Sequence, residues 1–211
     1  MRKLILMLFC LSAVFASAQT TDDLLHQGQA RRQAKKVSEL KLDKQNYWIG
    51  KVPVVDGLAT FQKTIVCPGK SQAQLMESMT AVVENIIAAS KLENASSLVP
   101  QDAAQGQVIA TVGELMYFKN KAWEADFTKF YYQLTANCTD GKVTLTINHL
   151  QYRYEEGREE GGNYLKAEGW ITDDGVFNNS KTKFLKEPAK FRRATIDRAN
   201  AIFKLAQDAV K

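Results

Sequence analysis

Few side chains in this sequence could carry out acid–base or nucleophilic chemistry. The chain has two histidines, His26 and His149. His26 lies in a polar segment near the N-terminus, so a histidine acting as general acid or base would have to be His149. The sequence contains no GxSxG, HExxH, CxxC, Walker or dinucleotide-binding motif. We therefore predict no catalytic, cofactor-binding or metal-binding residues. The alternative is a cell-envelope hydrolase that uses His149 with a carboxylate.

The first 18 residues have the features of a secretory signal peptide. Arg2 and Lys3 form a positive start, Leu4–Phe15 is a short apolar run, and residues 16–18 (Ala-Ser-Ala) fit a signal-peptidase site. The run is shorter than the roughly 20 apolar residues that a membrane-spanning helix needs. We predict cleavage after residue 18, export to the periplasm or the cell exterior, and no transmembrane segment in the mature chain.

Two cysteines, Cys67 and Cys138, remain in the predicted mature chain. In an oxidising compartment such a pair is a candidate disulfide. The alternative is two small buried apolar side chains, because free cysteine is among the residue types most often buried. The residues alone leave both interpretations open.

Composition and charge are typical of a globular domain. Hydrophobic residues make up 45% of the chain and charged residues 24%. The formal net charge is +5, and it falls to +3 when Arg2 and Lys3 leave with the signal peptide. No basic run is long enough for a nucleic-acid-binding arm, so we expect no nucleic-acid partner. Residues 19–46 predict a polar linker or a frayed helix, and residues 47–211 predict one domain that includes a C-terminal helix.

A strand followed by a helix begins the domain. Asp56-Gly57 predicts a turn, and Leu58–Cys67 predicts a strand that Pro68 must end. Ser71 is a good N-cap. The apolar residues after it recur at three- and four-residue spacing, which predicts an amphipathic helix facing a core. They are Leu75, Met76, Met79, Val82, Val83, Ile86 and Ile87.

Three further strands follow a loop at Glu93–Gln107. They are predicted at Gln107–Phe118, Asp126–Cys138 and Lys142–Tyr154. Residues 139–141 (Thr-Asp-Gly) predict the hairpin between the last two strands. Past His149 the apolar residues move to the other alternating phase of the strand, which predicts a bulge near Asn148. In the first of the three strands, Gly113 predicts a weak point or a bulge.

The C-terminal part predicts helices. Asn163–Phe177 contains enough apolar residues for a short packed helix, and Pro188 suits the first turn of a final helix ending near Val210. An apolar stripe on that final helix predicts its buried side, formed by Phe191, Thr195, Ala199, Ile202, Ala206 and Val210. Arg192, Arg193 and Lys204 are predicted to form a solvated side.

This order of elements resembles a known uncharacterised family. The segments VVDGLATFQKTIVCPGKSQAQL, ATVGEL and DGKVTLTINHLQYRYEE are similar to the family named domain of unknown function 4468, found in secreted proteins of anaerobic Gram-negative bacteria. The resemblance implies an α+β, TBP-like (helix-grip-like) fold of order β-α-β-β-β-α. Its four-stranded antiparallel sheet would carry helices on one face. No catalytic residues are implied.

The TBP-like topology also implies a sheet order of first, fourth, third and second strand. Cys67 and Cys138 would then lie on the inward face at the same end of the sheet. Their strands would be separated by the strand between them, and a disulfide needs Cα atoms within about 7 Å. Twisted strand ends would allow the bond, whereas a flat sheet would not.

The function expected from the sequence is binding without catalysis. The resemblance and the lack of a catalytic constellation favour an exported domain that binds an unknown protein partner or a small apolar ligand between sheet and helices. An outward face rich in Thr and Tyr could serve a partner, or it could be a solvated sheet surface. It comprises Tyr131, Gln133, Thr135, Thr144 and Thr146. The sequence does not define the oligomeric state.

Overall fold

The chain divides into two compact units, one ending at Trp48 and one comprising Ile49–Lys211. The structure, a computed structural model, describes residues 28–92, 94–99, 104–121, 123–155 and 162–211. The predicted signal peptide, residues 1–18, lies outside these residues. In the first unit, residues 28–46 form a helix whose side chains are almost all exposed. No helix within the described ranges has the length and apolar character needed to cross a membrane.

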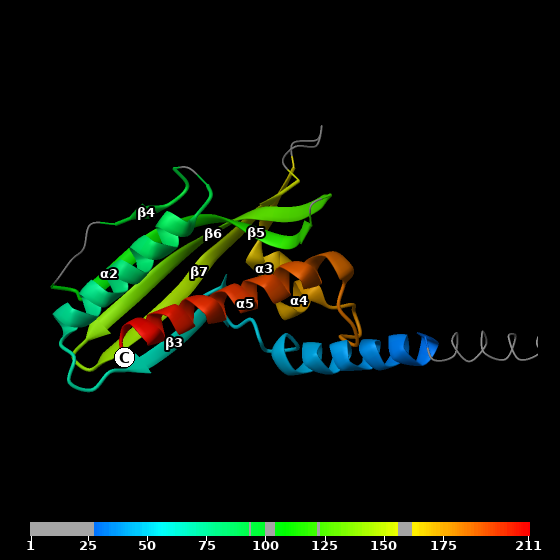
Figure 1. Cartoon of the computed structure of the whole chain (residues 1–211), viewed down its shortest axis with the longest axis horizontal. Coiled ribbons are helices and arrows are strands. Elements are labelled where there is room, and N and C mark those ends of the chain that lie inside the picture. The colour runs from blue at the N-terminus through cyan, green and yellow to red at the C-terminus, as the bar shows by residue number, and fades with distance from the viewer. Residues whose placement is uncertain (1–27, 93, 100–103, 122, 156–161) are drawn as a thin grey trace, which may run out of the picture. The chain divides into compact units, whose positions relative to one another are not determined.

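The second unit is built on an antiparallel sheet (Figure 1). Its strands, in spatial order, are β3 (Phe61–Val66), β7 (Lys142–Tyr154), β6 (Glu124–Thr139), β5 (Gln107–Lys121) and β4 (Ser97–Leu98), and β8 (Asn163–Lys166) also pairs with β7. The long strands therefore follow the predicted order of first, fourth, third and second. The α+β class and the antiparallel pairing are confirmed.

Within the described residues the sheet has six strands, whereas the sequence predicted four. β4 lies in the segment predicted as a loop, and β8 lies in the segment predicted as a helix. The reason for β8 is visible in the register. β3 pairs only with Lys142–Ile147, and the same edge of β7 continues to Tyr154. An uncovered edge exposes unpaired backbone groups, and β8 satisfies them along Gln151–Tyr154.

Residues 54–67 form three short strands instead of a turn followed by one continuous strand. β1 (Val54–Val55) and β2 (Leu58–Ala59) make a small hairpin, with Asp56 and Gly57 at positive φ in its turn. Thr60 separates this hairpin from β3. The predicted turn is confirmed, but the continuous strand from Leu58 to Cys67 was wrong.

Helix α2 (Gln72–Ala89) matches the sequence pattern. The Ser71 hydroxyl accepts a hydrogen bond from the backbone N–H of Gln74, and the Gln74 side chain accepts one from the backbone N–H of Ser71. This capping box satisfies two amides at the start of the helix. The predicted stripe is buried at Leu75, Met76, Met79, Val82, Val83 and Ile86.

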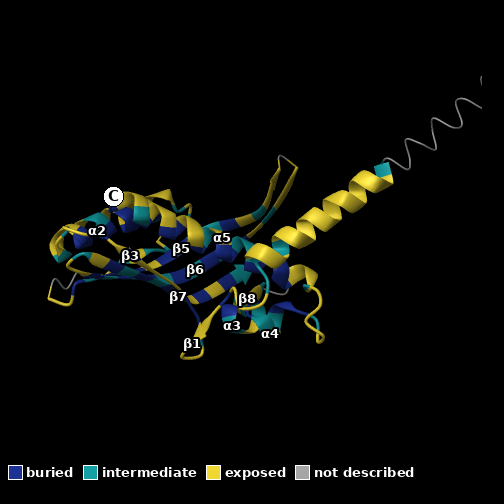
Figure 2. Ribbon diagram, turned by 90° about the horizontal axis from the view of Figure 1, so that it is seen from below, coloured by how far each residue is buried: buried dark blue, intermediate teal, exposed yellow. Residues whose placement is uncertain are grey.

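Helix α5 (Lys186–Ala209) lies on the same face of the sheet as α2, and α3 (Ala167–Trp170) and α4 (Asp173–Val176) precede it (Figure 2). Its predicted apolar stripe is buried. The prediction that Arg192 is solvated was wrong, because its side chain is completely buried. Arg192 donates to the Ile171 carbonyl at 2.7 Å and to Asp173 Oδ1 at 2.8 Å. These partners compensate the cost of burying the charge.

The predicted bulge in β7 is confirmed. His149 and Leu150 together oppose Tyr132 of β6, and His149 has a φ of +54°. Gly113 makes no bulge, and the irregularity between β5 and β6 lies at Tyr117 and Lys119 instead. A Cβ at Gly113 would lie 2.7 Å from the carbonyl oxygen of Ala95, so this glycine permits a close chain crossing.

Candidate functional site

A groove of about 740 Å³ is lined by residues of β5 and α5, with one residue from the end of α2. We call it the β5–α5 groove. Its apolar lining residues include Met116 and Phe118 of β5 and Ala194 and Ala201 of α5. Helix α2 contributes only Ala89, because its main apolar stripe is packed against the rest of the core. The groove therefore lies between the sheet and the last helix. The sequence predicted a ligand site between sheet and helices but did not specify the helix.

A bidentate ion pair forms the polar part of this groove. Arg198 of α5 donates from Nε and Nη2 to the two carboxylate oxygens of Glu114 on β5, both at 2.7 Å. The Glu114 side chain is 13% exposed and that of Arg198 is 26% exposed. Burial alone would lower the pKa of Arg198, but the contact with Glu114 outweighs it, so the pKa is raised. The guanidinium of Arg198 is therefore charged at neutral pH.

Sequence reasoning missed this pair, although one signal was present. Glu114 belongs to the same alternating phase as Val108, Ala110, Val112 and Met116, which are all buried. An acidic residue in the inward phase of an apolar strand requires a partner, because an unpaired buried charge is costly. The partner could not be identified, because Arg198 lies 84 positions away on a helix that also carries other basic residues.

Tyr132 of β6 lies beside the same pair. Its side chain is 1% exposed, and its hydroxyl has no hydrogen-bond partner among the described residues. Burial raises the pKa of Tyr132, and the Glu114 carboxylate raises it further. The hydroxyl therefore lies close enough to Glu114 and Arg198 for both side chains to affect this pKa. A buried hydroxyl without a partner costs about 1–3 kcal/mol, so this position calls for an explanation.

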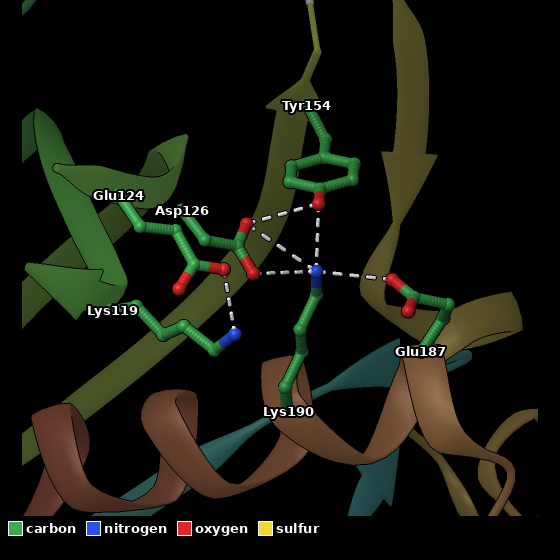
Figure 3. Close-up of polar contacts among 6 residues, drawn as sticks. All are labelled: Lys119, Glu124, Asp126, Tyr154, Glu187 and Lys190. Atoms are coloured by element: carbon green, nitrogen blue, oxygen red, sulfur yellow. Dashed lines mark hydrogen bonds and ion pairs between the residues drawn. The ribbon is translucent and has the colours of Figure 1, made fainter.

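A second polar cluster lies beside the groove, around Lys190 of α5 (Figure 3). Its Nζ donates to the Tyr154 hydroxyl at 2.7 Å and forms ion pairs with Asp126 and Glu187, each at 3.0 Å. Tyr154 in turn donates to Asp126 at 2.9 Å. Burial alone would lower the pKa of Lys190, but these contacts outweigh the effect of burial, so the pKa is raised. The three protons of the ammonium group match its three partners, Tyr154, Asp126 and Glu187, which suits a structural role.

His149, the basis of the hydrolase alternative, is exposed at the β7 bulge. Its Nδ1 lies 2.9 Å from Oδ1 of Asn148, and the described residues place no carboxylate in an ion pair with it. A general base needs an oriented partner and a nearby reacting group. Within the described ranges, no group of three His, Cys, Asp or Glu residues could hold a metal ion.

Cys67 and Cys138 lie at the end of the sheet that carries the β6–β7 hairpin. Cys138 pairs with Val143 in the ladder, and the backbone N–H of Cys67 donates to the Gly141 carbonyl at 2.7 Å. Both side chains are buried, and both are free thiols in this structure. Burial raises the pKa of Cys138 to about 11, and the proximity of Cys67 adds to the rise.

The outward face of the sheet is a network of polar contacts. The Thr64 and Thr144 hydroxyls lie 3.0 Å apart, and Gln62 donates to Thr146 at 3.2 Å. Arg153 lies over the rings of Tyr131 and Tyr164, at 5.2 and 4.5 Å from their centroids. The predicted residues Tyr131, Gln133, Thr135, Thr144 and Thr146 are all half-buried. This arrangement is typical of a solvated sheet surface with its own cross-strand pairs.

Exposed aromatic side chains gather beyond this polar network. Tyr117 of β5 and Phe127 of β6 have ring centroids 5.5 Å apart and are 38% and 42% exposed. Trp123, between the two strands, is 83% exposed. Neighbouring exposed aromatic residues are enriched at sites of protein association.

Comparison with known proteins identifies related sequences and folds. Residues 61–153 match the family model described as "Domain of unknown function (DUF4468) with TBP-like fold". A DUF4468 family protein from Bacteroides ovatus is 33% identical, with a TM-score of 0.72 over 80% of this chain and 95% of that chain. A TBP-like protein from Parabacteroides distasonis is 19% identical, with a TM-score of 0.61 over 75% and 96% of the two chains, and supports the fold alone. No curated protein matches the chain.

The unpartnered hydroxyl leads to a stability prediction. Tyr132→Phe removes a buried group that makes no hydrogen bond, so it should raise the free energy of unfolding by about 1 kcal/mol. For a chain of this size the midpoint of thermal unfolding should rise by about 2–4 °C. Differential scanning calorimetry or urea denaturation measures the change.

Tyr152→Phe is the matched control. The Tyr152 hydroxyl is also completely buried, but it lies 2.7 Å from the Thr195 hydroxyl. Its removal leaves Thr195 without that partner and should lower the free energy of unfolding by about 1–2 kcal/mol. Equal destabilisation by the two substitutions would mean that Tyr132 is hydrogen-bonded in the folded protein.

Proposed function

The chain belongs to the DUF4468 family of domains with a TBP-like fold, and on that basis we propose that it is a non-catalytic domain that binds a small apolar ligand in the β5–α5 groove. One observation carries the proposal, namely the groove of about 740 Å³, which is lined by seven uncharged residues and five charged ones. Its volume is in the range of small-molecule sites, which are mostly apolar with a few placed polar groups. Nothing in the comparisons supports the alternative of a cell-envelope hydrolase.

The groove has the rigid framework that a binding site needs. On one side it is bounded by β5, a strand held along its length by β6. On the other side it is bounded by α5, which Arg192 anchors to Asp173 and Arg198 anchors to Glu114. A site between two such elements is preformed, so a ligand would not have to order it on binding.

A protein partner is the second candidate. The exposed aromatic side chains of Tyr117, Phe127 and Trp123 favour it, because such residues supply much of the binding energy in protein interfaces. Tyr117 also borders the groove. The two candidates can be separated by substitutions, since Phe127 and Trp123 are not among the residues that line the groove.

The proposal includes export and a disulfide. The positive start, short apolar run and Ala-Ser-Ala site within residues 1–18 support removal of a signal peptide. In an oxidising compartment, the two buried thiols of Cys67 and Cys138, which lie at the same end of the sheet, are a candidate disulfide. The location would be the periplasm or the exterior of a Gram-negative bacterium.

One mass measurement tests both parts of this proposal. The protein recovered from a Gram-negative host that expresses the full chain is denatured without reductant, alkylated and weighed intact. We expect a chain that begins at Gln19 and carries no alkyl group, because the signal is removed and both thiols are bonded. A mass that retains residues 1–18 would contradict export, and two added alkyl groups would contradict the disulfide.

Blocking the groove tests ligand binding. Ala201 is an exposed residue of α5 that lines the groove, so Ala201→Trp should fill the space with an indole ring. We expect this variant to bind the uncharged apolar dye Nile red at least tenfold more weakly than the wild-type protein, measured by fluorescence titration.

Ala81→Trp provides the matched control. Ala81 is an exposed alanine on α2 outside the groove lining, so the same change should leave dye binding at the wild-type level. Circular dichroism establishes that both variants are folded. Equal dye binding by all three proteins would overturn the groove as the site. Loss of binding in Phe127→Ser, but not in Ala201→Trp, would move the site to the exposed aromatic face.

A further inference from the structure

The outer edge of strand β5, the edge away from β6, is only partly covered. β4 pairs with this edge at Ala110 and Thr111 alone. Two serine side chains then cover Gly113. Ser96 Oγ accepts a hydrogen bond from the backbone N–H of Gly113, and the Ser90 hydroxyl donates to its carbonyl. Within the described ranges the cover of the edge ends there.

The backbone groups of Leu115 and Tyr117 point to the uncovered part of this edge. In an antiparallel sheet, successive residues direct their N–H and C=O groups alternately to the two sides of the strand. The Ile109 carbonyl accepts from the N–H of Val99, and Gly113 binds the two serines, so the odd-numbered residues of β5 face away from β6 as far as Tyr117. No residue in the described ranges forms a hydrogen bond with the outward backbone groups of Leu115 or Tyr117.

The β5–α5 groove includes this uncovered edge. Side chains of a strand alternate between its two faces, so a pocket on one face is lined by every second residue. The groove is instead lined by consecutive residues of β5, from Glu114 to Phe118. Lining from both phases places the backbone of the strand edge at the groove. Unpaired N–H and C=O groups at an open edge are a template for another extended chain.

The charges of the lining favour an uncharged ligand. Its charged residues are Glu114, Lys190, Arg193, Asp197 and Arg198. Arg198 is paired with Glu114, and Lys190 is paired with two carboxylates outside the lining. Arg193 and Asp197 have opposite signs and lie four positions apart on α5. No surplus charge is left to compensate a charged ligand, and an uncompensated charge in a partly buried site is costly.

We propose that the ligand of this groove is an uncharged apolar peptide segment that binds in an extended conformation, as an added strand on the outer edge of β5. Its backbone exchanges hydrogen bonds with Leu115 and Tyr117. Its alternate side chains lie against the apolar lining at Met116, Phe118 and Ala201. In this mode of recognition the main chain supplies affinity and the alternate side chains supply specificity. The inference rests on the proposed function, since it uses the same groove, and names the class of ligand.

N-methylated peptides test the added strand without any change to the protein. The parent probe is the blocked peptide acetyl-Thr-Leu-Thr-Leu-Thr-Leu-Thr-amide, with a fluorophore on a glycine linker, and its binding to the chain without residues 1–18 is measured by fluorescence anisotropy. One isomer is methylated on the leucine amides and the other on the internal threonine amides. An extended chain directs these two sets of N–H groups to opposite sides, so only one set can pair with β5. We expect one isomer to bind about tenfold more weakly than the parent, the effect of losing two neutral hydrogen bonds, and the other to bind as the parent does.

Leu115→Pro tests the same contact from the side of the protein. Proline removes the outward N–H of Leu115, and an edge strand tolerates proline where that N–H has no partner in the sheet. Leu115→Ala is the matched control, because it shortens the side chain and keeps the N–H. We expect the proline variant to bind the parent peptide about three- to tenfold more weakly than the alanine variant, and both variants to bind Nile red equally. Circular dichroism establishes that both are folded, and the methylated peptides decide the question if the proline variant is not.

The outcomes separate this inference from the proposed function. Equal affinities of the two methylated isomers, or no binding of the parent peptide while Ala201→Trp still abolishes the binding of Nile red, would overturn the added strand and leave the groove as the site. If Ala201→Trp binds both Nile red and the peptide as the wild-type protein does, the proposed function itself fails. A wild-type dimer that becomes a monomer in Leu115→Pro and does not bind the peptide would assign the edge to a second copy of the chain, which also overturns the inference.

Discussion

The position of helix α5 depends on one constraint, namely that its buried and half-buried cations must each meet a carboxylate. Arg192 meets Asp173 of α4, Arg198 meets Glu114 of β5, and Lys190 meets Asp126 of β6. An unpaired charge in these positions would cost several kcal/mol, so the helix cannot slide or rotate without breaking these pairs. Burial of its apolar stripe favours the packing of α5 on the sheet. The three ion pairs then fix the position of the helix along the sheet and its rotation about its own axis.

The same constraint creates the candidate site. Opposite Arg198, β5 presents Glu114 where its other inward residues are apolar, so a polar pair replaces hydrophobic packing between strand and helix. Small side chains on α5, Ala194 and Ala201, leave the space beside the pair open. Tyr132 then retains a buried hydroxyl that the protein itself does not satisfy. That hydroxyl is enclosed in the core and Tyr132 does not line the groove, so the polar surface of the groove comes from the ion pair and its charged neighbours.

Much of the fold could be predicted from the residues, because periodicity and capping signals are local. The α2 stripe, the turn before β7 and the bulge at His149 all follow from patterns within a few residues. The added strand β8 could not be found this way, since its cause is the uncovered edge of β7 and depends on where β3 ends. The burial of Arg192 was missed for a similar reason, because its partners Ile171 and Asp173 lie about twenty residues away. The groove depends on contacts between residues that lie still farther apart in the sequence. Its only signal in the sequence was Glu114, an acidic residue in the inward phase of an apolar strand.

The most direct measurement follows the methyl NMR signals of the protein while Nile red is added. If the β5–α5 groove is the binding site, the signals of Met116, Ala194 and Ala201 should shift with a common dissociation constant. Shifts confined to residues next to Phe127 and Trp123, with the three groove methyl groups unchanged, would contradict the account.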